Sequence, residues 1–352
     1  MQDKKINVGL IGYGMAGQVF HAPLIDANPD LHLKTVVERH SDNSRKRYPW
    51  IEIVTDIEKV FNDDEIKLIV IATPNRTHFD LARQALLANK HVVVDKPFTV
   101  TSLEAKELTH LAKQQGKLLS VFQNRRWDGD FLTVKKIIEQ GLLGRLVEFE
   151  SHYDRYVNFI RDNPWKETNQ QGNGLLYDLG SHLIDQALVL FGVPDSVFAD
   201  MGVRRDSGTI IDHFEVILYY KTVKAILRSG LLVREAGARF SLHGTLGSFV
   251  KFGLDPQEEL LKQGAIPLGS DWGNESPSLW GKLNTQINGE HGISTRETER
   301  GDYPAYYRNI INAISKSEKL IVTPEAGTDI LRVIELAIQS NAEKRVIPFR
   351  EN

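Results

Sequence analysis

The chain has 352 residues, of which 41% are hydrophobic and 25% charged, as in an ordinary globular protein long enough for two domains. Its 43 basic and 46 acidic residues give a net charge of -3, which excludes the strongly basic surface that binds nucleic acid and a polybasic membrane patch. The absence of cysteine excludes disulfides, thiolate metal sites and a cysteine nucleophile.

The amino-terminal residues indicate a protein of the cytoplasm. The apolar run at residues 6–11 is too short for a signal peptide, and no apolar stretch approaches the length of a membrane-spanning helix. A chain without cysteine also suits a reducing compartment. We therefore expect a cytoplasmic protein without membrane or nucleic-acid partners.

The first third of the chain alternates strands and helices. Its strands are apolar without polar alternation, which is typical of a parallel sheet buried on both faces. Such alternation predicts a doubly wound α/β domain, a Rossmann fold, over residues 1–122. The predicted strands are 6–11, 33–37, 66–71, 91–94 and 118–122, and the predicted helices are 15–27, 77–88 and 102–115.

The remainder, residues 123–352, has a different pattern. Consecutive strands with short turns predict a large, mostly antiparallel sheet, and the helices beside it make this an α+β domain. Residues 264–277 are rich in Gly, Pro and Ser and are expected to form a loop. The predicted strands are 146–153, 196–203, 213–220, 224–231, 239–243 and 248–252, and the predicted helices are 130–140, 175–191, 306–316 and 324–342.

Residues 12–17, Gly-Tyr-Gly-Met-Ala-Gly, form a G-x-G-x-x-G motif between the first strand and the first helix. In this context Gly12 allows a tight turn, Gly14 lets a pyrophosphate approach the backbone, and Gly17 lets the helix pack on the strand. Met15 and Ala16 open the helix, whose N–H groups would face the phosphates. The motif predicts a dinucleotide site, although a plain glycine turn is the alternative.

The residues after the second strand leave the choice between NAD and NADP open. Glu38 can accept hydrogen bonds from the ribose diol, which favours NAD. Arg39 follows at once, and Arg45, Lys46 and Arg47 lie close in sequence. A guanidinium there could bind a 2′-phosphate or stack on adenine, or these could be solvated loop charges.

Two further groups follow strands at the carboxyl edge of the predicted sheet, where open α/β folds bind ligands. Thr73, Pro74 and Asn75 come after strand 66–71, and His78 either lines that crevice or simply starts a helix. Asp95-Lys96-Pro97 comes after strand 91–94. A partly desolvated Lys96 fixed by a rigid proline turn, either cis or trans, would suit proton transfer; a surface turn lysine is the alternative.

Asp178 and His182 are four residues apart on a predicted helix, and Asp185 lies three further on. One helix face would therefore carry an acid–base pair with its orienting partner. A helix cap and a satisfied histidine would explain the same residues. Ligands from one helix, without cysteine, make a poor metal site, so we expect no metal.

These motifs together resemble the glucose–fructose oxidoreductase, inositol dehydrogenase and MocA family (Gfo/Idh/MocA) along almost the whole chain. Residues 178–185 and 247–253, together with residues 20–24, look like a bacterial branch of this family that includes scyllo-inositol dehydrogenases. The resemblance rests on residues 12–17, Ala72-Thr73-Pro74-Asn75, 95–97, Gln123-Asn124-Arg125-Arg126-Trp127-Asp128, 178–185 and 247–253.

The resemblance implies a catalytic lysine at Lys96 and a proton-accepting histidine at His182, with Asp178 orienting the pair. The family's usual Glu-Lys-Pro is Asp95-Lys96-Pro97 here. Gln123 and Asn124 would lie near the nicotinamide. The residues expected to contact NAD or NADP are Gly12, Gly14, Met15, Ala16, Gly17, Glu38, Arg39, Thr73, Pro74, Asn75, His78, Asp95, Pro97, Gln123 and Asn124.

The implied reaction is hydride transfer between the nicotinamide and a hydroxyl or ketone carbon of a sugar or cyclic polyol such as an inositol. The expected substrate contacts are Arg125, Arg126, Tyr153, Tyr156 and Trp165. Two other functions are open: a non-catalytic dinucleotide or sugar sensor, and a glycosidase or isomerase that recycles its cofactor. If the broad face of the second sheet is apolar, we expect a homodimer or homotetramer.

Overall fold

The structure is a computed structural model, and it describes residues 5–160 and 167–350. The chain divides into two compact units that alternate along the sequence. The first comprises residues 1–127, 256–272 and 302–328, and the second comprises 128–255, 273–301 and 329–352. Each unit is described by itself below.

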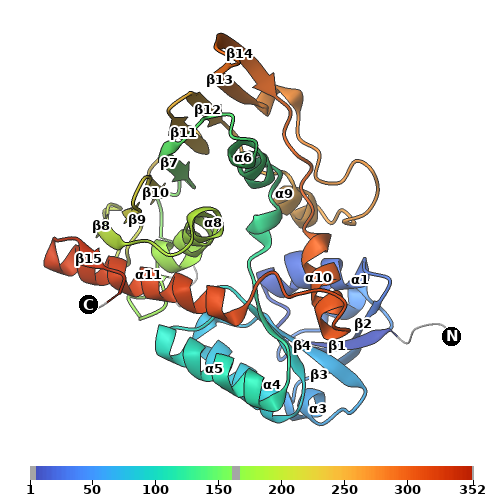
Figure 1. The fold of residues 1–352 in the computed structure, drawn as a ribbon. Helices are drawn as coiled ribbons and strands as arrows, with labels where there is room; N and C mark the ends of the chain where they lie inside the picture. Colours follow the sequence, from blue (N-terminus) through green and yellow to red (C-terminus); the bar gives the residue numbers. More distant parts are fainter. Residues whose placement is uncertain (1–4, 161–166, 351–352) are drawn as a thin grey trace. The chain divides into compact units, whose positions relative to one another are not determined.

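The first unit contains a six-stranded sheet in the order β3-β2-β1-β4-β5-β6, in which all pairs are parallel (Figure 1). The central strands are buried because β4 and β5 present apolar side chains to both faces. This confirms the predicted doubly wound sheet. The strands are β1 (Ile6–Ile11), β2 (Leu31–Val37), β3 (Glu52–Val54), β4 (Ile66–Ile71), β5 (His91–Asp95) and β6 (Leu119–Phe122).

The helices of the first unit follow the predicted ones within a few residues, with one difference. The helix after the glycine motif contains the π-helical segment η1 (Gly17–His21) before α1 (Ala22–Asp26). The sequence pattern did not predict β3 or the short helices at residues 43–47 and 58–61, because so few residues show no hydrophobic periodicity. The others are α2 (Asn43–Arg47), α3 (Glu58–Phe61), η2 (Asn75–Thr77), α4 (His78–Leu87), α5 (Ser102–Gln115), η3 (Asn124–Trp127), α9 (Gln257–Lys262) and α10 (Pro304–Ile314).

The second unit contains a nine-stranded sheet in the order β14-β13-β12-β11-β7-β10-β9-β8-β15. Its pairs are antiparallel except β7 with β10, which confirms a mostly antiparallel sheet. The strands are β7 (Leu146–His152), β8 (Ser196–Gly202), β9 (His213–Tyr219), β10 (Lys224–Gly230), β11 (Phe240–Gly244), β12 (Gly247–Lys251), β13 (Gly281–Ile287), β14 (Glu290–Arg296) and β15 (Ile347–Pro348).

Among the described residues of this unit, four further segments are α6 (Gly129–Glu139), η4 (Leu176–Gly180), α8 (Ser181–Phe191) and η5 (Pro277–Leu279). The predicted helix 175–191 therefore begins with a π-helical segment. Helix α11 (Pro324–Glu343) runs from the first unit into the second. The hairpin β13–β14 was not predicted, because residues of β14 are exposed on both faces and show no apolar alternation.

The two faces of the second sheet differ in chemistry. One face packs under α8, where the rings of Phe149 and Phe191 lie 5.4 Å apart. The other face carries ion pairs, including Lys224 Nζ to Glu148 Oε2 at 2.7 Å and Arg228 Nη1 to Glu150 Oε1 at 2.8 Å. The apolar face on which the predicted oligomer depended is thus interrupted by charge, and the oligomer stays a prediction.

Among the described residues, no helix combines the length and the apolar character needed to cross a membrane.

Helix α5 offers a test of local stability. Thr101 Oγ1 accepts a hydrogen bond from Glu104 N at 3.3 Å, and Glu104 Oε2 accepts one from Thr101 N at 3.0 Å, forming a capping box. We expect Thr101→Ala to lower the free energy of unfolding by about 1 kcal/mol, measured by urea denaturation. Thr101→Ser keeps the acceptor and should unfold as the parent does; equal loss in both variants would contradict the capping role.

Candidate functional site

The glycine turn between β1 and η1 is shaped by contacts within the chain at two of its three glycines. Gly12 has a φ of 98°, and a Cβ there would lie 2.7 Å from the carbonyl oxygen of Ala72. A Cβ on Gly17 would lie 2.2 Å from Gly12 O. A Cβ on Gly14 would meet nothing within 4 Å. The fold therefore requires Gly12 and Gly17 but not Gly14, and the exposed backbone at Gly14 fits the approach of a pyrophosphate.

The turn lies against the ends of two neighbouring strands. Gly12 N donates to Val37 O, at the end of β2, at 3.3 Å, and Ala72 N donates to Ile11 O at 2.9 Å. Met15, at the start of the helix, has 55% of its surface exposed. This is the carboxyl edge of a parallel sheet, the place where such folds hold a nucleotide.

His78 joins the two loops that follow β4 and β5. Its Nδ1 lies 2.9 Å from Pro97 O, and its Nε2 lies 2.8 Å from Thr73 O. The ring is 1% exposed. The sequence left open whether His78 lines the crevice or starts a helix. His78 is the first residue of α4, and its buried side chain connects the Thr73 loop to the Lys96 loop by hydrogen bonds. Pro74 is exposed beside it, and Asn75 is buried.

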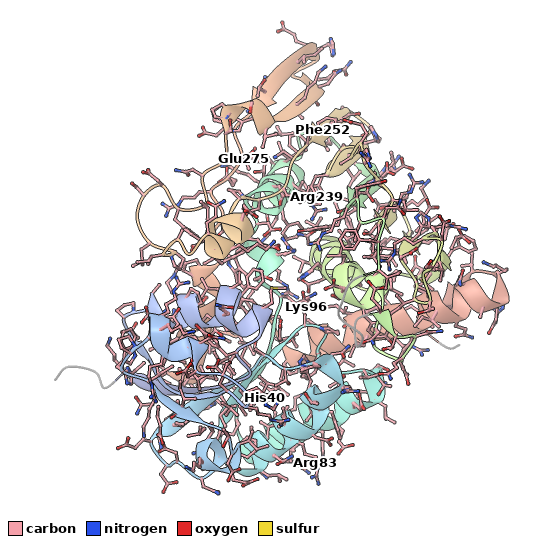
Figure 2. The ribbon with its side chains drawn as sticks, turned by 180° about the vertical axis from the view of Figure 1, so that it is seen from behind. His40, Arg83, Lys96, Arg239, Phe252 and Glu275 are labelled. Atoms are coloured by element: carbon pink, nitrogen blue, oxygen red, sulfur yellow. The ribbon has the colours of Figure 1, made fainter. Side chains whose placement is uncertain are left out.

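Lys96 stands on a rigid turn at the end of β5 and is half-buried (Figure 2). The Lys96–Pro97 peptide bond is cis. Asp95 Oδ1 accepts a hydrogen bond from Lys96 N at 2.7 Å, so Asp95 holds the turn through its side chain. The short side chain of Asp95 thus binds the backbone of the lysine that follows it.

Behind Asp95 lies a buried pair that sequence reasoning did not identify. His21 Nδ1 lies 2.7 Å from the hydroxyl of Tyr307, and His21 Nε2 lies 3.9 Å from Asp95 Oδ1. Burial lowers the pKa of His21 to about 4 and raises the pKa of Tyr307 well above its usual range. His21 is in the noted stretch 20–24, but its partner is 286 residues away in sequence, which no local pattern shows.

Gln123 and Asn124 follow β6 at the same sheet edge and are buried, with 2% and 4% of their surfaces exposed. Within the part of the chain that the structure describes, Gln123 Oε1 is buried without a hydrogen-bond partner. Buried acceptors are nearly always paired, so an unpaired one fits a donor from a bound molecule. A carboxamide such as that of nicotinamide carries such a donor.

Glu38, expected to accept hydrogen bonds from a ribose diol, is buried. It is 6% exposed, and its carboxylate accepts hydrogen bonds from Asn43 N and Ser44 Oγ in the first turn of α2. Arg39, the next residue, is exposed.

Arg125 and Arg126, expected to contact substrate, are both engaged by the chain. Arg125 is buried and pairs with Glu258 of α9. Burial alone would raise the pKa of Glu258, but the charges of Arg125 and Lys262 lower it to about 2. Arg126 Nη1 donates to Ile321 O at 2.9 Å. These contacts place both arginines in the packing of the first unit.

In the second unit, Asp178 lies in η4 and His182 in the first turn of α8, with 4% of His182 exposed. Asp185 is likewise buried. The pair therefore spans the change from π to α geometry, and π-helical turns are often found at functional sites. The sequence period alone gave no sign of this change.

Tyr153 is buried between two arginines, with the guanidinium carbons of Arg155 and Arg239 at 5.3 Å and 5.5 Å from its ring centroid. Tyr156 is exposed, and the guanidinium carbon of Arg234 lies 4.0 Å from its ring centroid. Trp165, the remaining expected substrate contact, lies outside the described residues.

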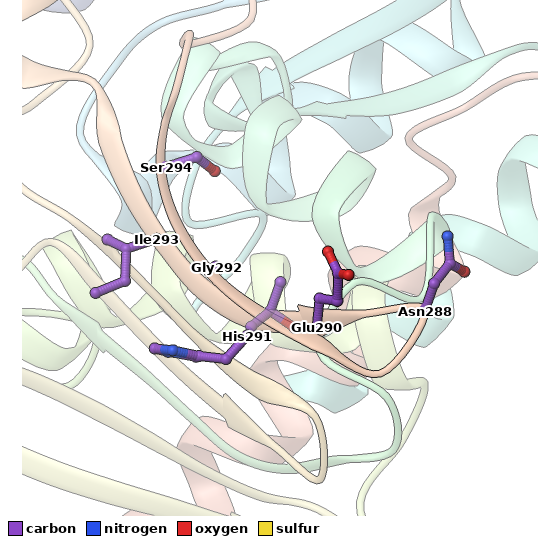
Figure 3. A pocket seen from close by; sticks show the side chains of 7 residues that line it. Asn288, Glu290, His291, Gly292, Ile293 and Ser294 are labelled. Carbon is purple, nitrogen blue, oxygen red and sulfur yellow. The ribbon is translucent and has the colours of Figure 1, made fainter.

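A hollow beside the β13–β14 hairpin contains none of the residues expected to bind cofactor or substrate (Figure 3). It is lined by Thr285, Asn288, Glu290, His291, Gly292, Ile293 and Ser294. Among the described residues, no group of three or more His, Cys, Asp or Glu side chains is placed to hold a metal ion.

Comparison with known proteins assigns both halves of the chain to one family. The NAD-binding Rossmann fold of the GFO_IDH_MocA oxidoreductase family matches residues 6–123, and the C-terminal alpha/beta domain of that family matches residues 135–349.

Individual relatives match nearly the full length. The uncharacterized oxidoreductase YdgJ of Escherichia coli K12 is 45% identical over 95% of this chain and 96% of its own. The scyllo-inositol 2-dehydrogenase (NADP(+)) IolW of Bacillus subtilis 168 is 38% identical over 97% of this chain and 95% of its own. The crystal structure of an oxidoreductase from Bacillus cereus, 32% identical, matches with a TM-score of 0.91 over 99% of both chains.

The open space at Gly14 predicts a variant that separates binding from folding. Gly14→Ala should unfold as the parent does but bind NADH and NADPH about tenfold more weakly, because the methyl group occupies the path of the pyrophosphate. Tryptophan fluorescence titration and urea denaturation measure the two effects. Gly237→Ala, also in open space, is the matched control. Unchanged affinity in Gly14→Ala would place the dinucleotide elsewhere.

The buried His21 predicts a pH effect on stability. Its pKa is about 4 when folded and near 6.5 when unfolded, so between these values only the unfolded chain binds the proton. The free energy of unfolding should therefore fall as pH drops from 6.5 to 4, by up to about 1.4 kcal/mol per pH unit from this group.

We expect His21→Gln to flatten that slope and the exposed-site variant His110→Gln to retain it, as measured by urea denaturation at several pH values. His91, whose pKa burial also lowers to about 4, contributes equally in all three proteins. The same slope in His21→Gln and the parent would contradict a neutral buried His21.

Proposed function

Because the chain belongs to the GFO_IDH_MocA oxidoreductase family, we propose that it is a dehydrogenase acting on a hydroxyl or ketone carbon of a sugar or cyclic polyol. The protein is an oxidoreductase of the NAD(P)-binding kind. The polyol substrate is supported by IolW, a relative that is named as a scyllo-inositol 2-dehydrogenase.

One observation carries the proposal. The carboxyl edge of the first sheet brings together a glycine that the fold itself does not need, Gly14, and a lysine turn, Lys96, that is fixed by two side chains. A backbone open to phosphate and a lysine on a hydrogen-bonded turn at one sheet edge fit a dinucleotide enzyme better than a glycine turn that serves packing alone.

The bound dinucleotide would supply the hydride chemistry, and the chain supplies position and charge. The residues that would hold it are Gly14 at the pyrophosphate and Gln123 at the carboxamide. The half-buried ammonium of Lys96 would hold the substrate oxygen and stabilise negative charge that develops on it. Asp95 and His78 keep that ammonium in place by fixing the turn on both sides.

His182 is proposed to accept the hydroxyl proton when the substrate is oxidised and to return it in reduction. Its low exposure would shield the transferred proton from bulk water. Asp178, one turn before it, would orient the imidazole and stabilise its charged form. These two roles rest on the family's D-x-x-x-H pattern together with their place on η4 and α8.

Removal of the proposed lysine should affect chemistry rather than binding. Lys96→Ala is expected to lower kcat by about a hundredfold, with the dissociation constants of NADH and NADPH little changed. Lys106→Ala, which changes an exposed lysine of α5, should turn over normally. Steady-state kinetics with inositols, hexoses and their keto forms, together with a separate titration of the dinucleotide, measure both quantities. Near-parental kcat in Lys96→Ala would end this assignment.

His182→Ala should also lower kcat by about a hundredfold. Because the proposed role is proton transfer, the loss should be smaller at high pH, where hydroxide can take the proton. His110→Ala, an exposed histidine of α5, is the control. If the purified parent binds a dinucleotide yet turns over no polyol or ketose, the protein is a sensor rather than a dehydrogenase.

A further inference from the structure

The carboxylate of Glu38 is fully occupied by its own chain. Its Oε1 accepts from the Ser41 hydroxyl and from Asn43 N at 2.9 Å. Its Oε2 accepts from Ser44 N at 3.2 Å and from Ser44 Oγ at 2.6 Å. A carboxylate offers about four lone-pair positions, and these four donors fill them. No acceptor position remains for the two hydroxyls of a ribose.

The same contacts favour the charged form of Glu38. Burial would raise its pKa, but the hydrogen bonds from the Ser41 and Ser44 side chains and from the Ser44 and Asn43 backbones outweigh burial and lower the pKa. The carboxylate therefore stays ionised inside the loop at neutral pH. To bind a ribose diol it would have to give up charge-assisted hydrogen bonds that the loop already supplies.

The residues after Glu38 present cations instead. Arg39, His40 and Arg45 are exposed, and within the described part of the chain none of their side chains forms a hydrogen bond or an ion pair (Figure 2 labels His40). Asp42 is the single acidic residue from 39 to 47, against four basic ones, which are Arg39, Arg45, Lys46 and Arg47. Residues 39–47, the loop after Glu38 together with α2, thus have a surplus of positive charge.

This loop lies beside the glycine turn. Val37, two residues before Arg39, accepts the hydrogen bond from Gly12 N. Tyr13 of the turn is close enough to Arg47 and Glu38 for their charges to affect its pKa, which burial raises. A dinucleotide whose pyrophosphate meets Gly14 would therefore bring its adenosine ribose to the end of β2, where Arg39 begins the loop.

From this arrangement we propose that the cofactor is NADP(H), that Arg39 and the exposed cations beside it bind the 2′-phosphate, and that Glu38 is a positioning residue for their loop. The inference rests on the proposed function, since it needs a dinucleotide at the glycine turn. A guanidinium matches a phosphate group with paired N–H donors, whereas the 2′-hydroxyl of NADH would leave the same cations without a partner.

The first test is binding without turnover. Isothermal titration of the full chain should give an NADPH dissociation constant at least tenfold below that of NADH, and 2′,5′-ADP should bind more tightly than 5′-AMP. Arg39→Ala should raise the dissociation constants of NADPH and 2′,5′-ADP about tenfold. It should change the dissociation constant of NADH by less than twofold. Arg83→Ala, which alters an exposed arginine of α4, should change none of these constants.

The second test separates the positioning of Glu38 from direct contact. If Glu38 bound a ribose, Glu38→Gln would lower the affinity for NADH and raise the affinity for NADPH. If Glu38 is a positioning residue, Glu38→Gln should lower the affinity for NADPH and leave the affinity for NADH nearly unchanged. Ser44→Ala, which removes one donor to the carboxylate, should change NADPH affinity in the same direction.

The outcomes assign failure clearly. If both dinucleotides bind and NADH binds more tightly, or if Glu38→Gln improves NADPH, this inference is overturned while the proposed function stands. If neither dinucleotide binds, both this inference and the proposed function are overturned. If Arg39→Ala leaves NADPH affinity unchanged, the exposed cations are only solvated loop charges and the inference is overturned.

Discussion

The close approach of the glycine turn to neighbouring strand ends is the constraint on which the first unit depends. Gly12 lies so near Ala72 O, and Gly17 so near Gly12 O, that any side chain at either position would clash with backbone. These contacts draw the turn onto the carboxyl ends of β1, β2 and β4. The backbone of Gly14 is then left open at the same edge, and its missing side chain has no explanation within the fold.

The same edge also collects polar side chains whose hydrogen bonds fix the neighbouring loops and turns. His78 bridges two carbonyls, Asp95 binds the backbone of Lys96, and Glu38 holds the loop before α2. The hydrogen bonds of His78 to Pro97 O and of Glu38 to Ser44 Oγ are buried, where such bonds are electrostatically stronger than in water. The result is a set of hydrogen-bonded turns that carry Lys96 and Arg39. His78, Asp95 and Glu38 stabilise these turns.

Strands, the glycine turn and the lysine turn could be read from the sequence because each produces a local signal. Apolar runs without alternation marked β1, β4 and β5, and the predicted α5 matched the structure at both ends because Thr101 and Gly116 bound it. Strand β14 could not be read, because nearly all of its residues are exposed and show no apolar period.

Side-chain roles were harder to predict than elements. Sequence places Glu38 where a ribose is bound, but only coordinates reveal that Ser41, Asn43 and Ser44 already occupy its oxygens. Arg125 is expected to contact substrate, and its pairing with Glu258, which is 133 residues away, could not be read from the sequence. The contact between His21 and Tyr307 is equally non-local. Composition and spacing report which groups exist, whereas their partners depend on the tertiary fold.

A crystal structure of the protein with bound NADPH tests the central claim most directly. We expect the pyrophosphate against the backbone at Gly14, the nicotinamide beside Lys96, and the 2′-phosphate at Arg39 with Glu38 still bound to Ser44. Density for the dinucleotide away from the glycine turn, or a nicotinamide remote from Lys96, would contradict the account.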